Sequence, residues 1–219
     1  MHLYITYKRY SSWSLRPWLA MKVKGIPFND TVLPYAHDDS LRQFAATHSV
    51  PATVPILEHN GQMIWDSLAI LEFLADQYPQ KHLWPESSAL RALARSASAE
   101  MHCGFSALRT EHPMNCHRVQ PMTPSAAVQA NLDRLAGIWQ HFDNADKPQG
   151  KFLCGDFTIA DAMFAPIAWR SRGYQLPISD SFDRWSDAVM ALPAMHEWVK
   201  DGEAESWRVA ETEQIGVQS

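Results

Sequence analysis

The chain has 219 residues, of which 46% are hydrophobic and 20% charged, a balance typical of a globular protein that buries a core in one large or two modest domains. A net charge of −5 argues against the basic face of a nucleic-acid-binding protein. No apolar run approaches the roughly 20 residues of a membrane-spanning helix. The three widely spaced cysteines fit a reducing compartment. We therefore expect a cytoplasmic protein with no nucleic-acid or membrane partner.

The first predicted elements are a strand, a serine-rich loop and a helix. Residues 2–6 form the strand, and the helix is expected from Ser14, as its N-cap, to about residue 24, where Gly25 stops it. Pro17 is expected in the first turn, where its missing N–H costs little. Because a helix N-terminus carries free N–H groups and partial positive charge, it stabilises an adjacent anion. The loop is thus predicted to be the reactive centre.

The next stretch predicts a small α/β domain with four strands. A second strand over residues 28–33 implies a right-handed parallel crossover. Asn60-Gly61 is the strongest short hairpin signal in the chain and separates two further strands. The remaining predicted elements are a short helix from Asp38 to about Ala46, strands over 54–59 and 62–65, and a helix over 68–77 capped by Asp66-Ser67.

Beyond residue 78 the strand patterns disappear and helical periodicity takes over. Two prolines within residues 79–87 mark a linker, so we expect one domain over 1–78 and an all-helical domain over 88–219. Helices are predicted over 86–112, 123–142, 158–171, 182–191 and 193–201, with a loosely held polar tail from about residue 203.

Thr158 and Asp161 form a Thr-x-x-Asp capping box at the start of the most apolar helix. In such a box the hydroxyl and the carboxylate satisfy two otherwise free backbone N–H groups. We interpret the pair as a folding device and not as catalytic residues.

Four motifs in this order resemble the cytosolic glutathione transferase family. They are the serine-rich turn after the first strand, Val54-Pro55 before the third strand, Trp65 to Ile70 after the hairpin, and Gly155 to Asp161 in the helical half. The resemblance implies a thioredoxin-like N-terminal domain followed by a C-terminal helical bundle, that is, α/β plus all-α. The serine pattern Ser-Ser-x-Ser-x-Arg is most similar to the zeta class.

The same resemblance implies that residues of the first loop activate the thiol of glutathione. Ser11 is expected to donate a hydrogen bond to the sulfur of glutathione, with Ser12 as its substitute and Trp13 in the binding site. Other classes use a tyrosine here, and Tyr7 is the nearest equivalent, although we favour a core role for it. Arg16 resembles the family's arginine in the first helix, where it either adds positive field or pairs with an acidic neighbour.

Further contacts to glutathione are implied outside that loop. The resemblance makes Pro55 a cis proline, so that the Val54 backbone pairs with the cysteinyl part of glutathione. Asp66 and Ser67 are expected to bind the γ-glutamyl end, its carboxylate by Ser67 and its ammonium by Asp66. The residue that holds the glycyl carboxylate stays open, and the candidates are His37, Arg42 and Thr53.

A pocket for a second substrate is expected where the helical half faces the first domain. The candidate lining residues are Met101, His102, Phe105 and Arg109. Trp13 stands where zeta enzymes usually have a cysteine, which puts isomerisation of maleylacetoacetate in doubt. The His and Cys residues over 112–117 lack the paired spacing of structural zinc sites, so no metal is predicted.

These features predict a glutathione S-transferase that activates the glutathione thiol for attack on a small hydrophobic electrophile. The alternatives are a zeta-like cis–trans isomerase and a non-catalytic binding protein on the same scaffold. A homodimer is expected from the family resemblance.

Overall fold

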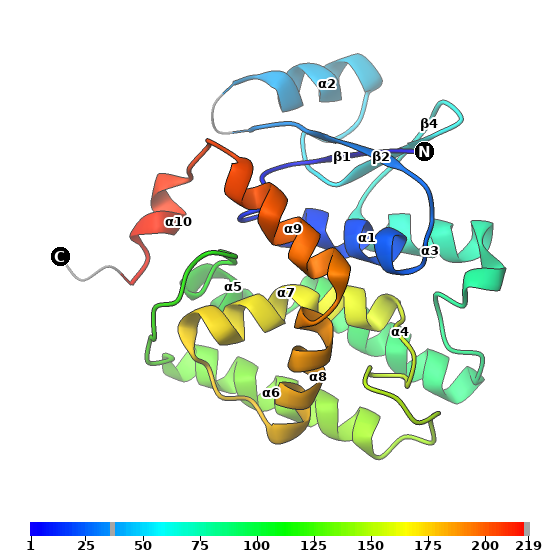
Figure 1. Cartoon of the computed structure of the whole chain (residues 1–219), viewed down its shortest axis with the longest axis vertical. Coiled ribbons are helices and arrows are strands. Elements are labelled where there is room, and N and C mark those ends of the chain that lie inside the picture. Colours follow the sequence, from blue (N-terminus) through cyan, green and yellow to red (C-terminus); the bar gives the residue numbers. More distant parts are fainter. Residues whose placement is uncertain (36–37, 217–219) are drawn as a thin grey trace.

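The computed structural model describes residues 1–35 and 38–216, and its N-terminal part is a four-stranded sheet in the order β2-β1-β3-β4 (Figure 1). The first two strands pair in parallel, as the predicted crossover requires, and the other pairings are antiparallel. Asn60 and Gly61 at the hairpin both have positive φ, 52° and 79°, as a type I′ turn demands. The strands are β1 (His2–Ile5), β2 (Asn29–Val32), β3 (Ile56–His59) and β4 (Gln62–Ile64).

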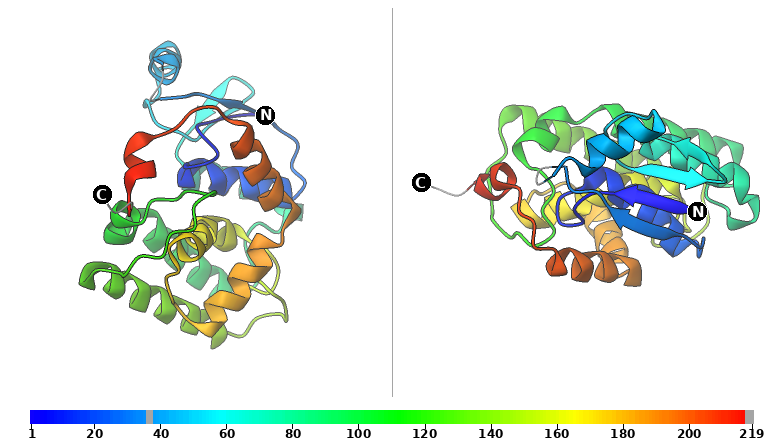
Figure 2. Two further views of the ribbon diagram at one scale, coloured as in Figure 1. Left: turned by 60° about the vertical axis from the view of Figure 1, so that its left-hand side comes forward. Right: turned by 90° about the horizontal axis from the view of Figure 1, so that it is seen from above.

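Helices cover both faces of this sheet. α1 (Ser12–Val23) and α3 (Ser67–Gln77) lie on the face toward the helical half, and α2 (Ser40–His48) lies on the opposite face (Figures 1 and 2). Asp66 caps α3 as predicted, since its carboxylate accepts a hydrogen bond from the backbone N–H of Leu68 at 3.0 Å.

The start of α1 differs from the prediction. Its N-cap is Ser11, not Ser14, because the Ser11 hydroxyl oxygen accepts the backbone N–H of Ser14 at 3.2 Å. Pro17 consequently lies inside the helix, beyond the first turn. The reactive loop is therefore shorter than expected, and the helix N-terminus begins directly at Ser11.

The helical half is centred on one buried element, α7 (Ile159–Tyr174), which contacts α1, α4 and α8. Nearly all of its residues are buried, as the all-round apolar pattern predicted. None of the helices in the described part of the chain is long and apolar enough to cross a bilayer. After a 3₁₀ turn at Pro79–Lys81, the others are α4 (Ser88–Cys103), α5 (Ser106–Glu111), α6 (Ala126–Asp143), α8 (Asp180–Met190), α9 (Pro193–Ala204) and α10 (Ala210–Gln214).

The long helix predicted over 86–112 is in fact two helices, α4 and α5. The chain turns at Gly104 and Phe105, and Phe105 has a left-handed φ of 61°. A Cβ at position 104 would come within 2.8 Å of the backbone oxygen of Glu100. Helical periodicity continues across the break, so it could not reveal the turn.

We expect Gly104→Ala to lower the free energy of unfolding by about 1–3 kcal/mol, because the added methyl group meets backbone and not a flexible side chain. Gly137→Ala is the matched control, since its Cβ would meet only the end of the Arg134 side chain at 3.7 Å within α6. That change should stabilise the protein by up to about 1 kcal/mol. Urea denaturation of both variants measures the two effects, and equal effects would contradict the packing explanation.

Asp161 lies in the first turn of α7 and forms the predicted capping box with Thr158. It also accepts hydrogen bonds from residues outside that box. Its fully buried carboxylate accepts the backbone N–H of Leu153 at 2.9 Å and of Thr158 at 2.7 Å. It also accepts the Thr158 hydroxyl at 3.1 Å and the Trp185 indole N–H at 2.8 Å. Burial raises the pKa of this carboxyl, and the four hydrogen bonds oppose that shift.

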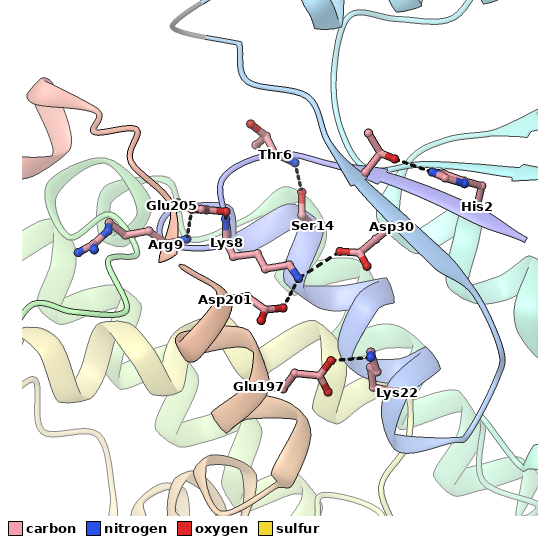
Figure 3. A network of polar contacts seen from close by, with 11 residues as sticks. His2, Thr6, Lys8, Arg9, Ser14, Lys22, Asp30, Glu197, Asp201 and Glu205 are labelled. Carbon is pink, nitrogen blue, oxygen red and sulfur yellow. Dashed lines mark hydrogen bonds and ion pairs between the residues drawn. The ribbon is translucent and has the colours of Figure 1, made fainter. Parts of the chain in front are cut away.

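The segment after α9 is not the loose tail that the sequence predicted. The Glu205 carboxylate accepts the backbone N–H groups of Lys8 at 2.8 Å and Arg9 at 3.4 Å (Figure 3). The Tyr10 hydroxyl donates to Glu213 in α10. We refer to residues 205–214 as the C-terminal strap, because they tie the end of the described chain to its first loop.

Candidate functional site

A pocket of about 460 Å³ opens beside the loop between β1 and α1. The cap residue Ser11 and the first two residues of α1, Ser12 and Trp13, contribute to its lining, and the chain before β3 contributes Thr53 and Val54. Its other lining residues are Thr6, Tyr7, Tyr10, Tyr35, Asp38, Leu41, Arg42 and Ala52. The pocket thus lies at the N-terminus of α1, where the sequence predicted the reactive centre.

The hydroxyl of Ser11 belongs to a chain of hydrogen bonds. The Ser14 hydroxyl oxygen, fully buried, accepts the backbone N–H of Thr6 at 3.2 Å, and the Ser11 and Ser14 hydroxyls lie 2.8 Å apart (Figure 3 shows Thr6 and Ser14). The Ser14 backbone N–H points to the Ser11 oxygen. In this hydrogen bond the Ser11 hydroxyl donates to the Ser14 oxygen. Hydroxyl protons rotate to suit their acceptors, so the direction can reverse, with Ser14 donating to Ser11 and Ser11 donating to an anion in the pocket. Such a chain polarises the terminal O–H and strengthens its donation.

Ser12 is the first residue of α1 and also lines the pocket. Both Ser11 and Ser12 are largely buried, which limits competition from water for a bound group. The free backbone N–H groups in the first turn of α1 place a partial positive charge beside these two hydroxyls. The geometry therefore suits an anionic atom such as a thiolate sulfur.

The peptide bond between Val54 and Pro55 is cis, which confirms the expectation drawn from the family resemblance. Val54 lines the same pocket as Ser11. Of the candidates for the glycyl carboxylate, Arg42 and Thr53 also line it. The third candidate, His37, lies outside the described residues.

Asp66 and Ser67 lie at the N-terminus of α3 and do not line the pocket at Ser11. The Ser67 hydroxyl is fully buried and has no hydrogen-bond partner among the described residues. The second oxygen of Asp66 lies 3.1 Å from Nε2 of His102 in α4. The sequence placed His102 on the helix that faces the first domain, as a substrate-pocket residue, but did not indicate its pairing with Asp66, which tertiary packing creates.

Trp13 lies against three basic side chains. The Arg16 guanidinium is over its ring, 4.2 Å from the ring centre, and the Arg109 guanidinium is at 4.9 Å. The His102 ring meets it edge to face at 5.2 Å. Arg109 and His102 thus contact Trp13 of the first domain, as expected for residues on the side of the helical half that faces this domain. Neither of them lines the pocket at Ser11.

Met101 and Phe105, the other two residues predicted for the substrate pocket, are almost completely buried and do not line it. Tyr7 is fully buried, as a core residue should be, although it lines one side of the pocket. Its ring packs against Tyr35 at 5.2 Å and Trp207 at 5.8 Å. Trp207 belongs to the C-terminal strap, so the supposed tail contributes an aromatic neighbour that sequence periodicity did not indicate.

The histidine and cysteine residues over 112–117 do not form a metal site in the described structure. Within residues 1–35 and 38–216, no group of three or more His, Cys, Asp and Glu side chains is arranged to hold a metal ion. Cys116 is buried, and burial raises the pKa of its thiol far above the ordinary range. It therefore carries no reactive thiolate.

Two family models match the chain. The N-terminal domain of glutathione S-transferases matches residues 10–77, and the C-terminal domain of glutathione S-transferases matches residues 125–201. The two matched regions together cover more than half of the chain and include Ser11, Val54, Asp66 and the capping box.

Similar proteins point to the same family. The chain is 26% identical to a maleylpyruvate isomerase of a Ralstonia species over 82% of this chain and 86% of that protein. It is 27% identical to the glutathione S-transferase GstB of Escherichia coli K12 over 76% of this chain and 86% of that protein. The structure of a glutathione transferase homolog from Burkholderia, solved with bound glutathione, superimposes on this chain with a TM-score of 0.68 at 22% identity. The superposition covers 94% of this chain and 98% of that one. That structural likeness establishes the fold.

Proposed function

The chain belongs to the glutathione transferase family of glutathione-dependent enzymes, and on this premise we propose that it is a glutathione S-transferase. In this proposal Ser11 stabilises the thiolate of glutathione, which attacks a small hydrophobic electrophile. The observation that carries it is the hydrogen-bonded set of the Thr6 backbone N–H, the Ser14 hydroxyl and the Ser11 hydroxyl at the edge of a 460 Å³ pocket. Donation to the sulfur favours the thiolate, the reactive form of a thiol.

Glutathione is proposed to extend from this loop toward α3. Its cysteinyl part would pair with the backbone of Val54 as an added strand. Its γ-glutamyl carboxylate would meet the unpartnered Ser67 hydroxyl and the N-terminus of α3, and its ammonium would meet Asp66. Arg42 or Thr53 would hold the glycyl carboxylate, and Trp13 would cover the thiol.

An assay of glutathione with a panel of electrophiles tests the proposal. Halogenated nitroaromatics, unsaturated ketones and unsaturated acids should include compounds that are conjugated only when protein and glutathione are both present. Binding of glutathione without turnover of any of them would favour a non-catalytic binding protein. Sedimentation of the same sample would test the proposed homodimer, and limited proteolysis would test the proposed boundaries at 78 and 88.

The second candidate function is a zeta-like cis–trans isomerisation. The similarity to a maleylpyruvate isomerase supports it. Reversible addition of the glutathione thiolate to a double bond would allow rotation, and its elimination would restore the thiol. Glutathione would then be required but not consumed, so thiol titration during turnover separates isomerisation from conjugation.

A further inference from the structure

The loop between β1 and α1 forms a compact backbone turn that ends at Ser11. The backbone oxygen of Tyr7 accepts the N–H groups of Tyr10 at 3.2 Å and of Ser11 at 2.9 Å. The N–H groups of Lys8 and Arg9, inside this turn, find their acceptor outside it, as the first N–H groups of a helix must do. The turn that places Ser11 is therefore completed by another part of the chain.

That acceptor is the carboxylate of Glu205, the residue that follows the last turn of α9 and begins the C-terminal strap (Figure 3). One of its oxygens accepts the Lys8 N–H at 2.8 Å, and the other accepts the Arg9 N–H at 3.4 Å. Burial raises the pKa of the Glu205 carboxyl, whereas these two hydrogen bonds and the positive charges of Lys8 and Arg9 lower it. Because hydrogen bonds to an ionised group are strong, one side chain fixes two consecutive peptide groups.

Other contacts hold the same loop at different atoms. A Cβ on the buried Gly202 of α9 would lie 3.1 Å from the backbone nitrogen of Arg9, so the helix packs directly on the loop backbone. The Lys8 ammonium pairs with Asp201 at 2.6 Å, and the Arg9 backbone oxygen accepts the N–H of Cys116 at 3.0 Å. These contacts hold one side chain and one peptide oxygen, whereas the strap carboxylate holds the N–H side of two peptides.

The orientation of these peptides determines where the Ser11 hydroxyl lies. Ser11 is the last residue of the turn, and its hydroxyl oxygen accepts the Ser14 N–H at 3.2 Å and lies 2.8 Å from the Ser14 hydroxyl oxygen. Hydrogen bonds weaken steeply when the distance or the angle departs from its preferred range. A shift of about 1 Å in a group that acts on the reacting atom can cost about 100-fold in rate. Loosening of the turn would therefore weaken donation from Ser11.

We propose that Glu205 is a positioning residue for Ser11: its carboxylate closes the turn over residues 7–11 and thereby directs the Ser11 hydroxyl toward the sulfur of glutathione. This inference rests on the proposed function, in which that hydroxyl stabilises the thiolate. Glu205 does not line the pocket at Ser11, so it acts through the loop and not by contact with a ligand. A direct effect of its charge would have the opposite sign, because removal of a nearby negative charge stabilises an anion.

Glu205→Ala should raise the pKa of the bound glutathione thiol and lower kcat about tenfold, with KM for glutathione changed less than about twofold. Glu205→Gln keeps one acceptor oxygen and should recover part of both losses. Glu197→Ala is the matched control, because it removes a carboxylate of α9 that pairs at 2.6 Å with Lys22, in the last turn of α1 and far from Ser11 (Figure 3). A lowered or unchanged thiol pKa in Glu205→Ala overturns the proposal.

A double-mutant cycle shows whether Glu205 acts through Ser11. In that case Glu205→Ala should lower kcat/KM about tenfold in the parent, but less than about twofold when Ser11 has already been replaced by alanine. Equal losses in the two backgrounds, measured per folded molecule, would indicate a general loss of structure and would refute the positioning role.

A measurement without glutathione keeps this inference separate from the proposed function. The Ser14 backbone N–H reports where the Ser11 oxygen lies, because that oxygen is its acceptor. Its hydrogen–deuterium exchange, followed by NMR, should be at least about tenfold faster in Glu205→Ala and unchanged in Glu197→Ala. If the parent conjugates no electrophile and does not lower the thiol pKa, the proposed function fails, while this exchange still judges whether Glu205 positions Ser11. Unchanged Ser14 exchange in Glu205→Ala contradicts the proposal whether or not the protein is an active enzyme.

Discussion

Ser11→Ala is expected to lower kcat/KM for glutathione conjugation about 100-fold, the usual effect of removing one preorganised donor from a developing negative charge. The thiol of bound glutathione should show a raised pKa, because the last hydroxyl of the Thr6–Ser14–Ser11 chain no longer stabilises the thiolate. The ultraviolet absorbance of the bound thiolate, followed against pH, measures that pKa directly.

The controls for this prediction separate chemistry from folding. Ser11 is also the N-cap of α1, so its loss should cost about 1 kcal/mol of stability, and turnover is compared per folded molecule. Ser12→Ala removes the neighbouring hydroxyl, which lines the pocket but does not cap the helix, and should change kcat/KM less than about tenfold. If Ser12→Ala raised the thiol pKa and Ser11→Ala left it unchanged, the donor role would belong to Ser12.

For Asp161→Ala we expect a loss of about 3–5 kcal/mol in the free energy of unfolding, more than the roughly 1 kcal/mol of an ordinary cap. The variant would leave two backbone N–H groups, one hydroxyl and one indole N–H buried without their acceptor. Turnover per folded molecule should stay within about twofold, because Asp161 does not line the pocket at Ser11.

Urea denaturation measures the loss, and Ser125→Ala provides the comparison. Ser125 caps α6 by accepting one backbone N–H, that of Val128 at 3.2 Å, so its replacement should cost about 1 kcal/mol. Similar losses in the two variants would contradict the view that Asp161 organises a network of its own. Abolished turnover in folded Asp161→Ala would contradict its purely structural role.

The local signals in the sequence predicted the fold well. Asn60-Gly61 determines the hairpin because both positions need positive φ, and Asp66 and Thr158 mark helix starts because their side chains satisfy free N–H groups. The parallel pairing of β1 with β2 follows from the strand–helix–strand order. Such features depend on residues close in sequence, so sequence alone can reveal them.

Features that depend on distant residues were missed or misplaced. The N-cap of α1 is Ser11, whereas Ser14 was predicted, because any of the three serines could cap the helix. Which serine does so depends on the buried hydrogen bond from the Thr6 backbone N–H to the Ser14 hydroxyl. The contact of His102 with Asp66 joins α4 to the start of α3 across the predicted linker, and periodicity along either helix does not indicate it. Arg16 of α1 and Arg109 of α5 likewise lie over the same Trp13 ring, and charge patterns along a single helix do not predict that neighbourhood.

The C-terminal strap sets an order of events during synthesis. The four strands lie within the first 64 residues, so the sheet can pair soon after it leaves the ribosome. Glu205 and Glu213, however, follow their partners Lys8 and Tyr10 by 197 and 203 residues. The loop that carries Ser11 is therefore synthesised about 200 residues before the residues that anchor it. A nascent chain can hold a formed sheet while its reactive loop still lacks these anchors, and the site becomes complete only when α10 has been translated and has docked.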